Sequence, residues 1–178
     1  KTLCELPGLS GREEIVRREV LAIAREKLGE DAVSLDGLGS VIAVRRGTNP
    51  GKPRVMLAAH MDEVGLMVIS ATDDGLLRFR ALGGVDARVL VSKRVRVGYP
   101  TGDQPALMGV IGAMAIHQQT QEDRKAVLPI EQLMIDIGAK DKAEAERLAP
   151  AGTPVTFDTP YTPFGDGLVM TILTCATA

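Results

Sequence analysis

A short, uninterrupted apolar run that ends in three polar side chains constrains this 178-residue chain most strongly. Val55 to Ala59 does not alternate apolar with polar residues, which is typical of a β-strand buried on both faces. In open α/β sheets, ligands bind at the C-terminal ends of such strands. The run leads directly into His60, Asp62 and Glu63. We therefore expect a functional site at the end of this strand.

The spacing of His60 and Asp62 suits a metal site. An imidazole supplies one nitrogen ligand, and a carboxylate two residues later can bond the other ring nitrogen and so fix the orientation of the ring. His60 is therefore the candidate metal ligand. Asp62 is the candidate catalytic residue, and its carboxylate orients the His60 ring. A single histidine after a strand more often has a structural, hydrogen-bonded role. The triplet alone does not separate these two interpretations.

Composition excludes several classes of function. A formal net charge of −2 gives no reason to expect nucleic acid or an anionic membrane as a partner. An aromatic content of 3% without tryptophan argues against platforms that stack bases or sugars. No apolar stretch is long enough to span a bilayer, and the first residues lack the apolar core of a signal peptide. Because Cys4 and Cys175 are too few for a disulfide framework, we expect a cytoplasmic protein.

The first 50 residues predict a surface helix followed by a β-hairpin. Ser10 can cap the helix, and Glu13, three residues later, completes a capping box. Apolar residues then recur with helical spacing until Gly29, a typical helix stop. Two short β runs, 32–35 and 40–45, lie on either side of a turn. A helix and strands that precede a buried strand are typical of the beginning of an α/β sheet.

After Gly65 the pattern changes to short β runs separated by turns. The predicted strands cover residues 66–71, 77–82, 89–91, 94–97, 107–111, 134–138 and 153–157. One helix, capped by Asp141, fits over residues 142–148. Short strands with closely spaced turns are typical of a small barrel.

The two patterns together predict an α/β fold with an inserted barrel. Residues 1–65 and 159–178 are expected to form parts of one α/β domain and to share a sheet. Residues 66–158 are expected to fold separately as a small β-barrel domain. This assignment depends on the change near Gly65 and on the apolar run that begins at Leu168.

An ordered set of segments resembles the glutamyl or deblocking aminopeptidases that assemble into tetrahedral particles, a family sometimes mislabelled as endoglucanase or cellulase. The segments occur in the family's order, and the chain resembles the N-terminal half of these enzymes up to about residue 167. They are Leu6-Pro7-Gly8-Leu9-Ser10-Gly11, Ala59-His60-Met61-Asp62-Glu63-Val64-Gly65, Leu82-Gly83-Gly84-Val85-Asp86-Ala87-Arg88-Val89-Leu90, Gly109-Val110-Ile111-Gly112, Ile135-Asp136-Ile137-Gly138-Ala139-Lys140 and Gly152-Thr153-Pro154-Val155. Carbohydrate hydrolysis itself has no support from paired carboxylates or aromatic residues.

The resemblance implies a metal-dependent aminopeptidase with a zinc-peptidase-like mixed sheet and two divalent metal ions, usually zinc or cobalt. Its substrates are peptides, from which it removes N-terminal residues. By position in the family's pattern, His60 is a metal ligand and Asp62 orients it. Glu63 is expected to be local scaffolding, because the family takes its general base from a Glu-Glu pair further along. The inserted barrel is used in dimer contacts, so we expect a homo-oligomer, either a dimer or a dimer-based particle.

The chain departs from the family's pattern in two places. His117 follows Gly112 without the proline frame of the family, so a loop or barrel-surface position is expected for it. Residues 168–178 contain no carboxylate, although the family carries its metal-bridging Asp there, and Cys175 is expected to be a small buried residue. We therefore expect that metal binds weakly or not at all in this chain and that the chain is inactive alone. The alternative is a non-catalytic oligomerisation or peptide-binding module built on the barrel, with a vestigial His60.

Overall fold

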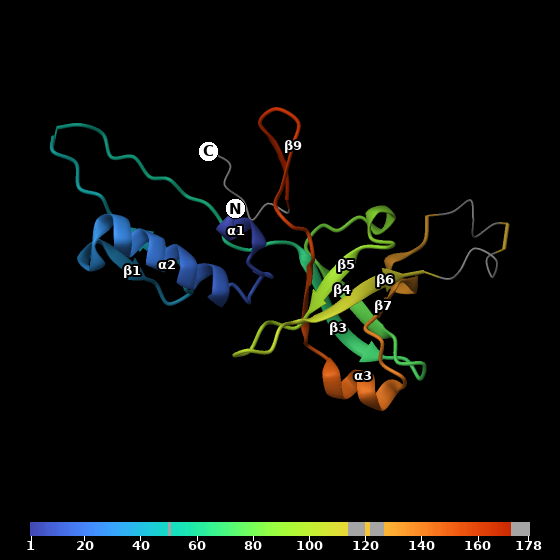
Figure 1. Ribbon diagram of the computed structural model, residues 1–178. Helices are drawn as coiled ribbons and strands as arrows, with labels where there is room; N and C mark the ends of the chain where they lie inside the picture. The colour runs from blue at the N-terminus through green and yellow to red at the C-terminus, as the bar shows by residue number, and fades with distance from the viewer. Residues whose placement is uncertain (50, 114–119, 122–126, 172–178) are drawn as a thin grey trace.

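Six antiparallel strands close into a barrel in the computed structural model, which describes residues 1–49, 51–113, 120–121 and 127–171 (Figure 1). The strand order is β3-β4-β7-β6-β5-β8, and the pairing of β3 with β8 closes the barrel. The strands are β3 (Gly65–Ala71), β4 (Leu77–Leu82), β5 (Arg94–Val97), β6 (Leu107–Gly112), β7 (Met134–Asp136) and β8 (Pro154–Phe157). The predicted small barrel is confirmed, and the fold is mixed α/β.

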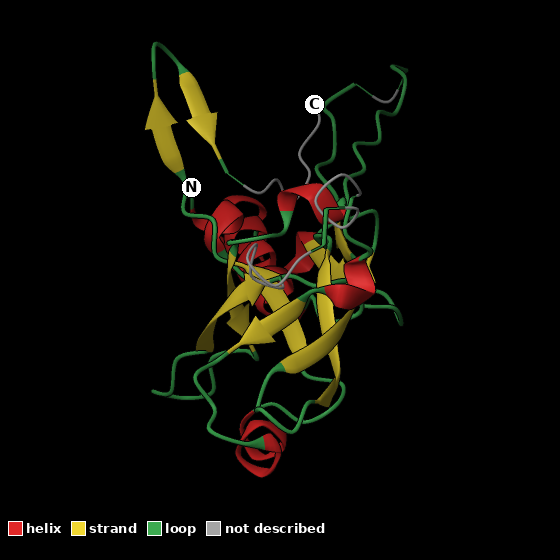
Figure 2. Ribbon diagram, turned by 90° about the vertical axis from the view of Figure 1, so that its right-hand side faces the viewer, coloured by secondary structure: helices red, strands yellow, loops and turns green. Residues whose placement is uncertain are grey.

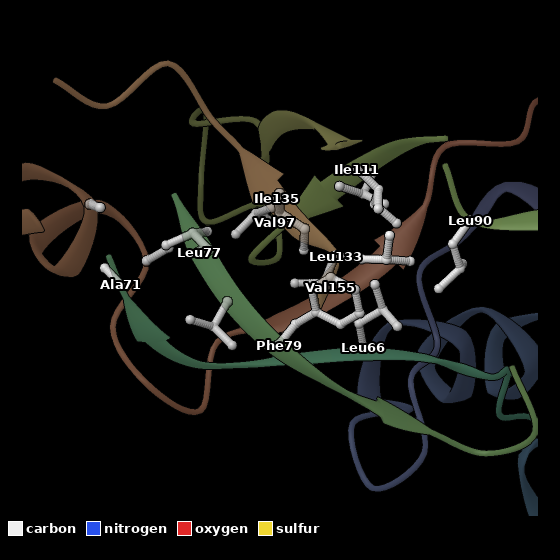
Figure 3. Close-up of a cluster of buried hydrophobic side chains, with 14 residues drawn as sticks. Leu66, Ala71, Leu77, Phe79, Leu90, Val97, Ile111, Leu133, Ile135 and Val155 are labelled. Carbon is white, nitrogen blue, oxygen red and sulfur yellow. The ribbon is translucent and has the colours of Figure 1, made fainter. Parts of the chain in front are cut away.

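Apolar side chains at alternate positions of the strands fill the barrel (Figure 3). This alternation follows from the pleat, which points successive side chains to opposite faces of a strand. The fully buried members from the strands are Leu66, Val68, Leu77, Val95, Val97, Ile111, Ile135 and Val155. The core of the described molecule is therefore the interior of the barrel.

Helix α3 (Lys142–Leu148) lies at the end of the barrel away from the N-terminus (Figure 2). The Asp141 side chain accepts a hydrogen bond of 2.9 Å from the Glu144 backbone N–H, which confirms the predicted cap. The predicted strand over 89–91 is wrong, because the chain there forms the 3-10 turn η2 (Ala87–Val89). The Asp86 carboxylate accepts from the Arg88 backbone N–H at 2.9 Å, and this local bond favours a turn over a strand.

The remaining elements flank the barrel. Helix α2 (Glu14–Leu28) packs on the hairpin that follows it and ends at Gly29, as predicted. The Gly29 N–H donates to the Arg25 carbonyl at 2.9 Å. The elements are α1 (Thr2–Glu5), α2 (Glu14–Leu28), η1 (Glu30–Ala32), β1 (Val33–Leu35) with β2 (Val41–Ala43), η5 (Ile130–Gln132), and β9 (Thr162–Phe164) with β10 (Leu168–Met170). None of the helices in the described ranges has the length and apolar character needed to cross a lipid bilayer.

The predicted buried strand over Val55–Ala59 does not form. These residues belong to no helix or strand, and Val55, Met56 and Leu57 are 84%, 87% and 94% exposed (Figure 1). A strand buried on both faces needs neighbouring strands and covering layers. In the described part of the chain, β1–β2 and β9–β10 are separate two-stranded sheets. The expected sheet shared between residues 1–65 and 159–178 is therefore also absent from the described residues.

The segment before α2 is fixed to the barrel, and we call residues 5–12 the N-terminal clamp. The Leu9 N–H donates to the Tyr99 hydroxyl oxygen, and that hydroxyl donates to the Arg12 carbonyl, both at 3.0 Å. Burial raises the pKa of Tyr99 to about 12, so its hydroxyl keeps the proton that it donates. The Arg96 guanidinium of β5 donates to the Glu5 carbonyl at 3.1 Å. The clamp is thus attached to the barrel at both of its ends.

The clamp approaches the barrel most closely at Gly65, the first residue of β3. A Cβ atom added to Gly65 would lie 2.6 Å from Leu9 Cδ1 and 2.7 Å from the Val155 carbonyl oxygen. Leu9 itself is fully buried and forms a parallel bridge with Glu63. Only a residue without a side chain fits between the clamp and β8.

We expect Gly65→Ala to lower the free energy of unfolding by about 1–3 kcal/mol, because the new methyl group overpacks this contact. Urea unfolding followed by circular dichroism measures the change. Gly84→Ala is the matched control, since nothing lies within 4 Å of its added Cβ. Equal urea midpoints for the two variants would show that the close approach at Gly65 does not exist in solution.

Candidate functional site

The His60 imidazole and the Asp62 carboxylate lie together, as their spacing predicts. His60 Nδ1 is 2.8 Å from Asp62 Oδ1 and 3.0 Å from the Asp62 backbone oxygen. Both of these oxygens are hydrogen-bond acceptors, so Nδ1 carries the hydrogen. A neutral imidazole in this tautomer has its lone pair at Nε2, which is the form that binds a metal ion.

Asp62 is held on its other side by Ser10. The Ser10 hydroxyl donates a hydrogen bond to Asp62 Oδ2, across 52 residues of sequence. This bond has the largest effect on the pKa of Asp62, and together with His60 it lowers that pKa below its usual value despite partial burial. Asp62 is therefore ionised at neutral pH and accepts hydrogen bonds on both carboxylate oxygens.

The predicted cap function of Ser10 is wrong. The residue at the N-cap of α2 is Glu13, and no side chain caps the helix. The Glu13 carboxylate instead accepts from the Gly11 backbone N–H at 2.6 Å. The contact of Ser10 with Asp62 is not predictable from the sequence, because no local pattern pairs residues so far apart.

Glu63 belongs to the contact between the clamp and the barrel. Its side chain is only 8% exposed, and its Oε1 accepts from the Gly8 N–H at 3.3 Å. Its own backbone N–H donates to the Gly8 carbonyl at 2.7 Å. Burial raises the pKa of the Glu63 carboxyl. These contacts support the scaffolding role expected for Glu63.

The described residues supply one candidate ligand for a metal ion, but they do not supply a complete set of ligands. No group of three or more His, Cys, Asp or Glu side chains within the described ranges is placed to hold a metal ion. A catalytic zinc ion takes about three protein ligands. His117 and Cys175 lie outside the described residues. His60, oriented by Asp62, is thus the candidate ligand that the structure offers.

The raised pKa of Glu63 predicts a pH-dependent stability. Glu63→Gln keeps an oxygen for the Gly8 N–H but cannot ionise. Below the usual carboxyl pKa, Glu63 of the unmodified chain is protonated in both the folded and the unfolded state, so its charge does not affect stability. As pH rises from that value through the raised pKa of the folded state, the unfolded state ionises first and the unfolding free energy of the unmodified chain falls. We therefore expect the unfolding free energy of the variant, relative to the unmodified chain, to increase between pH 4 and pH 8. Urea titrations across this range provide the measurement, and a difference that does not change with pH would contradict it.

Several known proteins similar to this chain are named as aminopeptidases. The lysyl aminopeptidase of Pyrococcus furiosus is 34% identical over 149 residues, which cover 83% of this chain and 41% of the relative. A TET aminopeptidase of a marine sediment archaeon of the Thaumarchaeota superposes with a TM-score of 0.80 at 33% identity, covering 94% of this chain and 46% of that one.

A second solved structure adds an assembled particle to the comparison. The TET1 peptidase of Pyrococcus horikoshii, which can assemble into a tetrahedron or a large octahedral shell, superposes with a TM-score of 0.72 at 35% identity. That match covers 90% of this chain and 46% of the peptidase. The chain thus spans less than half the length of the relatives that it matches.

The family profile that matches the sequence covers most of the features described above. It extends over residues 39–173, from the turn before β2 through the His60 segment and all six barrel strands. Since the match includes well over half of the chain, it identifies the family. This chain belongs to the M42 glutamyl aminopeptidase family.

Proposed function

We propose that this chain contributes the N-terminal part of a metal-dependent aminopeptidase that removes N-terminal residues from peptides. Residues 1–65 and 159–178 belong to its catalytic domain, and residues 66–158 are the inserted barrel. The observation that carries the proposal is the hydrogen bond of 2.8 Å between His60 Nδ1 and Asp62 Oδ1 in a chain of this family. It prepares one imidazole for a metal ion.

In this proposal His60 binds one of two divalent ions, zinc or cobalt, and Asp62 orients the ring. The other ligands come from outside the described residues, because no complete metal-binding group lies within them. Metal should therefore bind weakly, or not at all, to the chain alone. We place the protein in the cytoplasm, since two cysteines are too few for the disulfide framework of a secreted domain.

A chimera tests the proposal directly. Residues 1–167 of this chain would be joined to the part of the Pyrococcus furiosus lysyl aminopeptidase that its alignment leaves uncovered. We expect the chimera to cleave lysyl-p-nitroanilide when zinc or cobalt is added, and the 178-residue chain alone to show no turnover. Asp62→Asn in the chimera should lower kcat/KM about 10- to 100-fold, because it loosens the ring of a metal-binding histidine.

Two variants control this experiment. His60→Ala should abolish the activity of the chimera, whereas Asp74→Asn, in the exposed turn between β3 and β4, should leave it unchanged. Robust turnover by the chain alone that disappears in His60→Ala would show that its ligands are complete, for instance through a second subunit. Full activity of the His60→Ala chimera would overturn the proposed role of His60.

The second candidate function is a non-catalytic oligomerisation or peptide-binding module. It is favoured by the lack of a complete metal-binding group within the described ranges. The chimera separates the two functions, because a module without a catalytic role has no activity to restore.

We further propose that the outer face of the barrel around β6 mediates self-association. Pairing of free strand edges does not supply the contact, because the barrel is closed. Met108 and Val110 instead expose apolar side chains on β6, and Val89 and Val91 expose theirs beside it. The two segments adjoin, since the Ser92 N–H donates to the Ile111 carbonyl at 2.8 Å. Assembly of the TET1 peptidase of Pyrococcus horikoshii supports this proposal.

We expect Val110→Glu to shift a dimer of this chain to monomer in sedimentation velocity, because a charge is desolvated poorly in an apolar contact. Ile69→Glu is the matched control, since Ile69 is also exposed but lies on β3, across the barrel from β6. If Ile69→Glu dissociates the dimer and Val110→Glu does not, the association surface is on the other side of the barrel.

A further inference from the structure

We propose that Ser10 is a positioning residue that sets the orientation and the tautomer of His60 by holding Asp62. The inference deepens the proposed function and rests on it for its catalytic meaning. No sequence pattern assigns this role to Ser10. The structure places its hydroxyl, the Asp62 carboxylate and the His60 ring in one continuous line of hydrogen bonds.

The two oxygens of the Asp62 carboxylate are held by different residues. Ser10 donates to Oδ2, while His60 Nδ1 donates to Oδ1 at 2.8 Å. A carboxylate bonded through one oxygen can rotate about its Cβ–Cγ bond, whereas bonds to both oxygens fix its plane. Because the plane of the carboxylate directs the Nδ1–H bond, Ser10 controls the orientation of the imidazole.

Ser10 can perform this role because the barrel fixes the turn in which it lies. The turn from Leu9 to Arg12 is closed by a bond of 2.7 Å from the Arg12 N–H to the Leu9 carbonyl. Tyr99 binds both ends of this turn, at the Leu9 N–H and the Arg12 carbonyl. Because these bonds already order the turn, the hydrogen bond from Ser10 to Asp62 forms without a further loss of loop entropy.

The opposite end of the line is anchored as well. Residues 60–62 form no helix or strand, but the next residue, Glu63, exchanges two hydrogen bonds with Gly8. Asp62 and Ser10 are therefore each one or two residues away from a point where the two segments are paired. The pairing of Glu63 with Gly8 therefore brings the Ser10 hydroxyl and the Asp62 carboxylate together, although neither residue lies in a helix or strand.

The chain itself offers a readout of the tautomer, because it contains two histidines. In a His117→Ala background, ¹⁵N–¹H correlation spectra of the labelled chain at pH 8 report His60 alone as a neutral imidazole. We expect Nδ1 to carry the hydrogen. Ser10→Ala should change the ratio of tautomers about threefold to tenfold toward the Nε2–H form, the effect of losing one hydrogen bond.

Two variants separate the hydroxyl from other effects of substitution. Ser10→Thr retains a hydroxyl and should keep the original ratio. Ser34→Ala, on exposed strand β1, should also keep it. Circular dichroism verifies that all variants fold. An unchanged ratio in Ser10→Ala, or an equal change in Ser10→Ala and Ser10→Thr, would overturn the inference.

The chimera of the previous subsection distinguishes this inference from the proposed function. If Ser10→Ala changes the tautomer ratio of the chain and the His60→Ala chimera keeps full activity, the positioning role is supported and the assignment of His60 to a metal fails. If His60→Ala abolishes the activity of the chimera and Ser10→Ala leaves the tautomer ratio of the chain unchanged, the metal assignment is supported and the positioning role is overturned.

Discussion

The contact between Leu9 and Gly65 is the constraint on which the rest of the described structure depends. At this point the N-terminal clamp, the start of β3 and the carbonyl of Val155 in β8 meet, and no Cβ atom fits among them. The pairing of Gly8 with Glu63 lies directly beside the contact. It anchors the segment of His60 and Asp62, which has no regular secondary structure, to the barrel that holds the buried core. The candidate site is thus positioned by the barrel and not by a strand of its own.

The barrel was predictable because its information is local. Alternating runs such as 77–82 and 94–97 report the strands one by one, and all six strands of the barrel lie in one continuous part of the chain, from Gly65 to Phe157. The run Val55–Ala59 was not predictable in the same way. Its pattern reports that the side chains suit a buried strand, but burial requires neighbours, and none of the described strands provides them. An apolar run therefore indicates that its side chains suit burial, but it does not show that the folded chain buries them.

The same distinction applies to the candidate site. His60 and Asp62 are two residues apart, so their contact could be predicted from spacing and ring geometry alone. Ser10 and Tyr99 lie 52 and 37 residues away from Asp62, and only the folded chain brings them to it or to its supporting turn. A serine before a helix predicts a cap, because that is its commonest local use. Tertiary contacts gave its hydroxyl a different partner.

The exposed side chains of Val55, Met56 and Leu57 also have a colloidal consequence. An extended, uncharged apolar segment is a template on which other polypeptides deposit, and charged or proline residues at its borders act as gatekeepers against this. Lys52, Pro53 and Arg54 stand immediately before the segment. We therefore expect these three residues to limit the aggregation of this chain in concentrated solution.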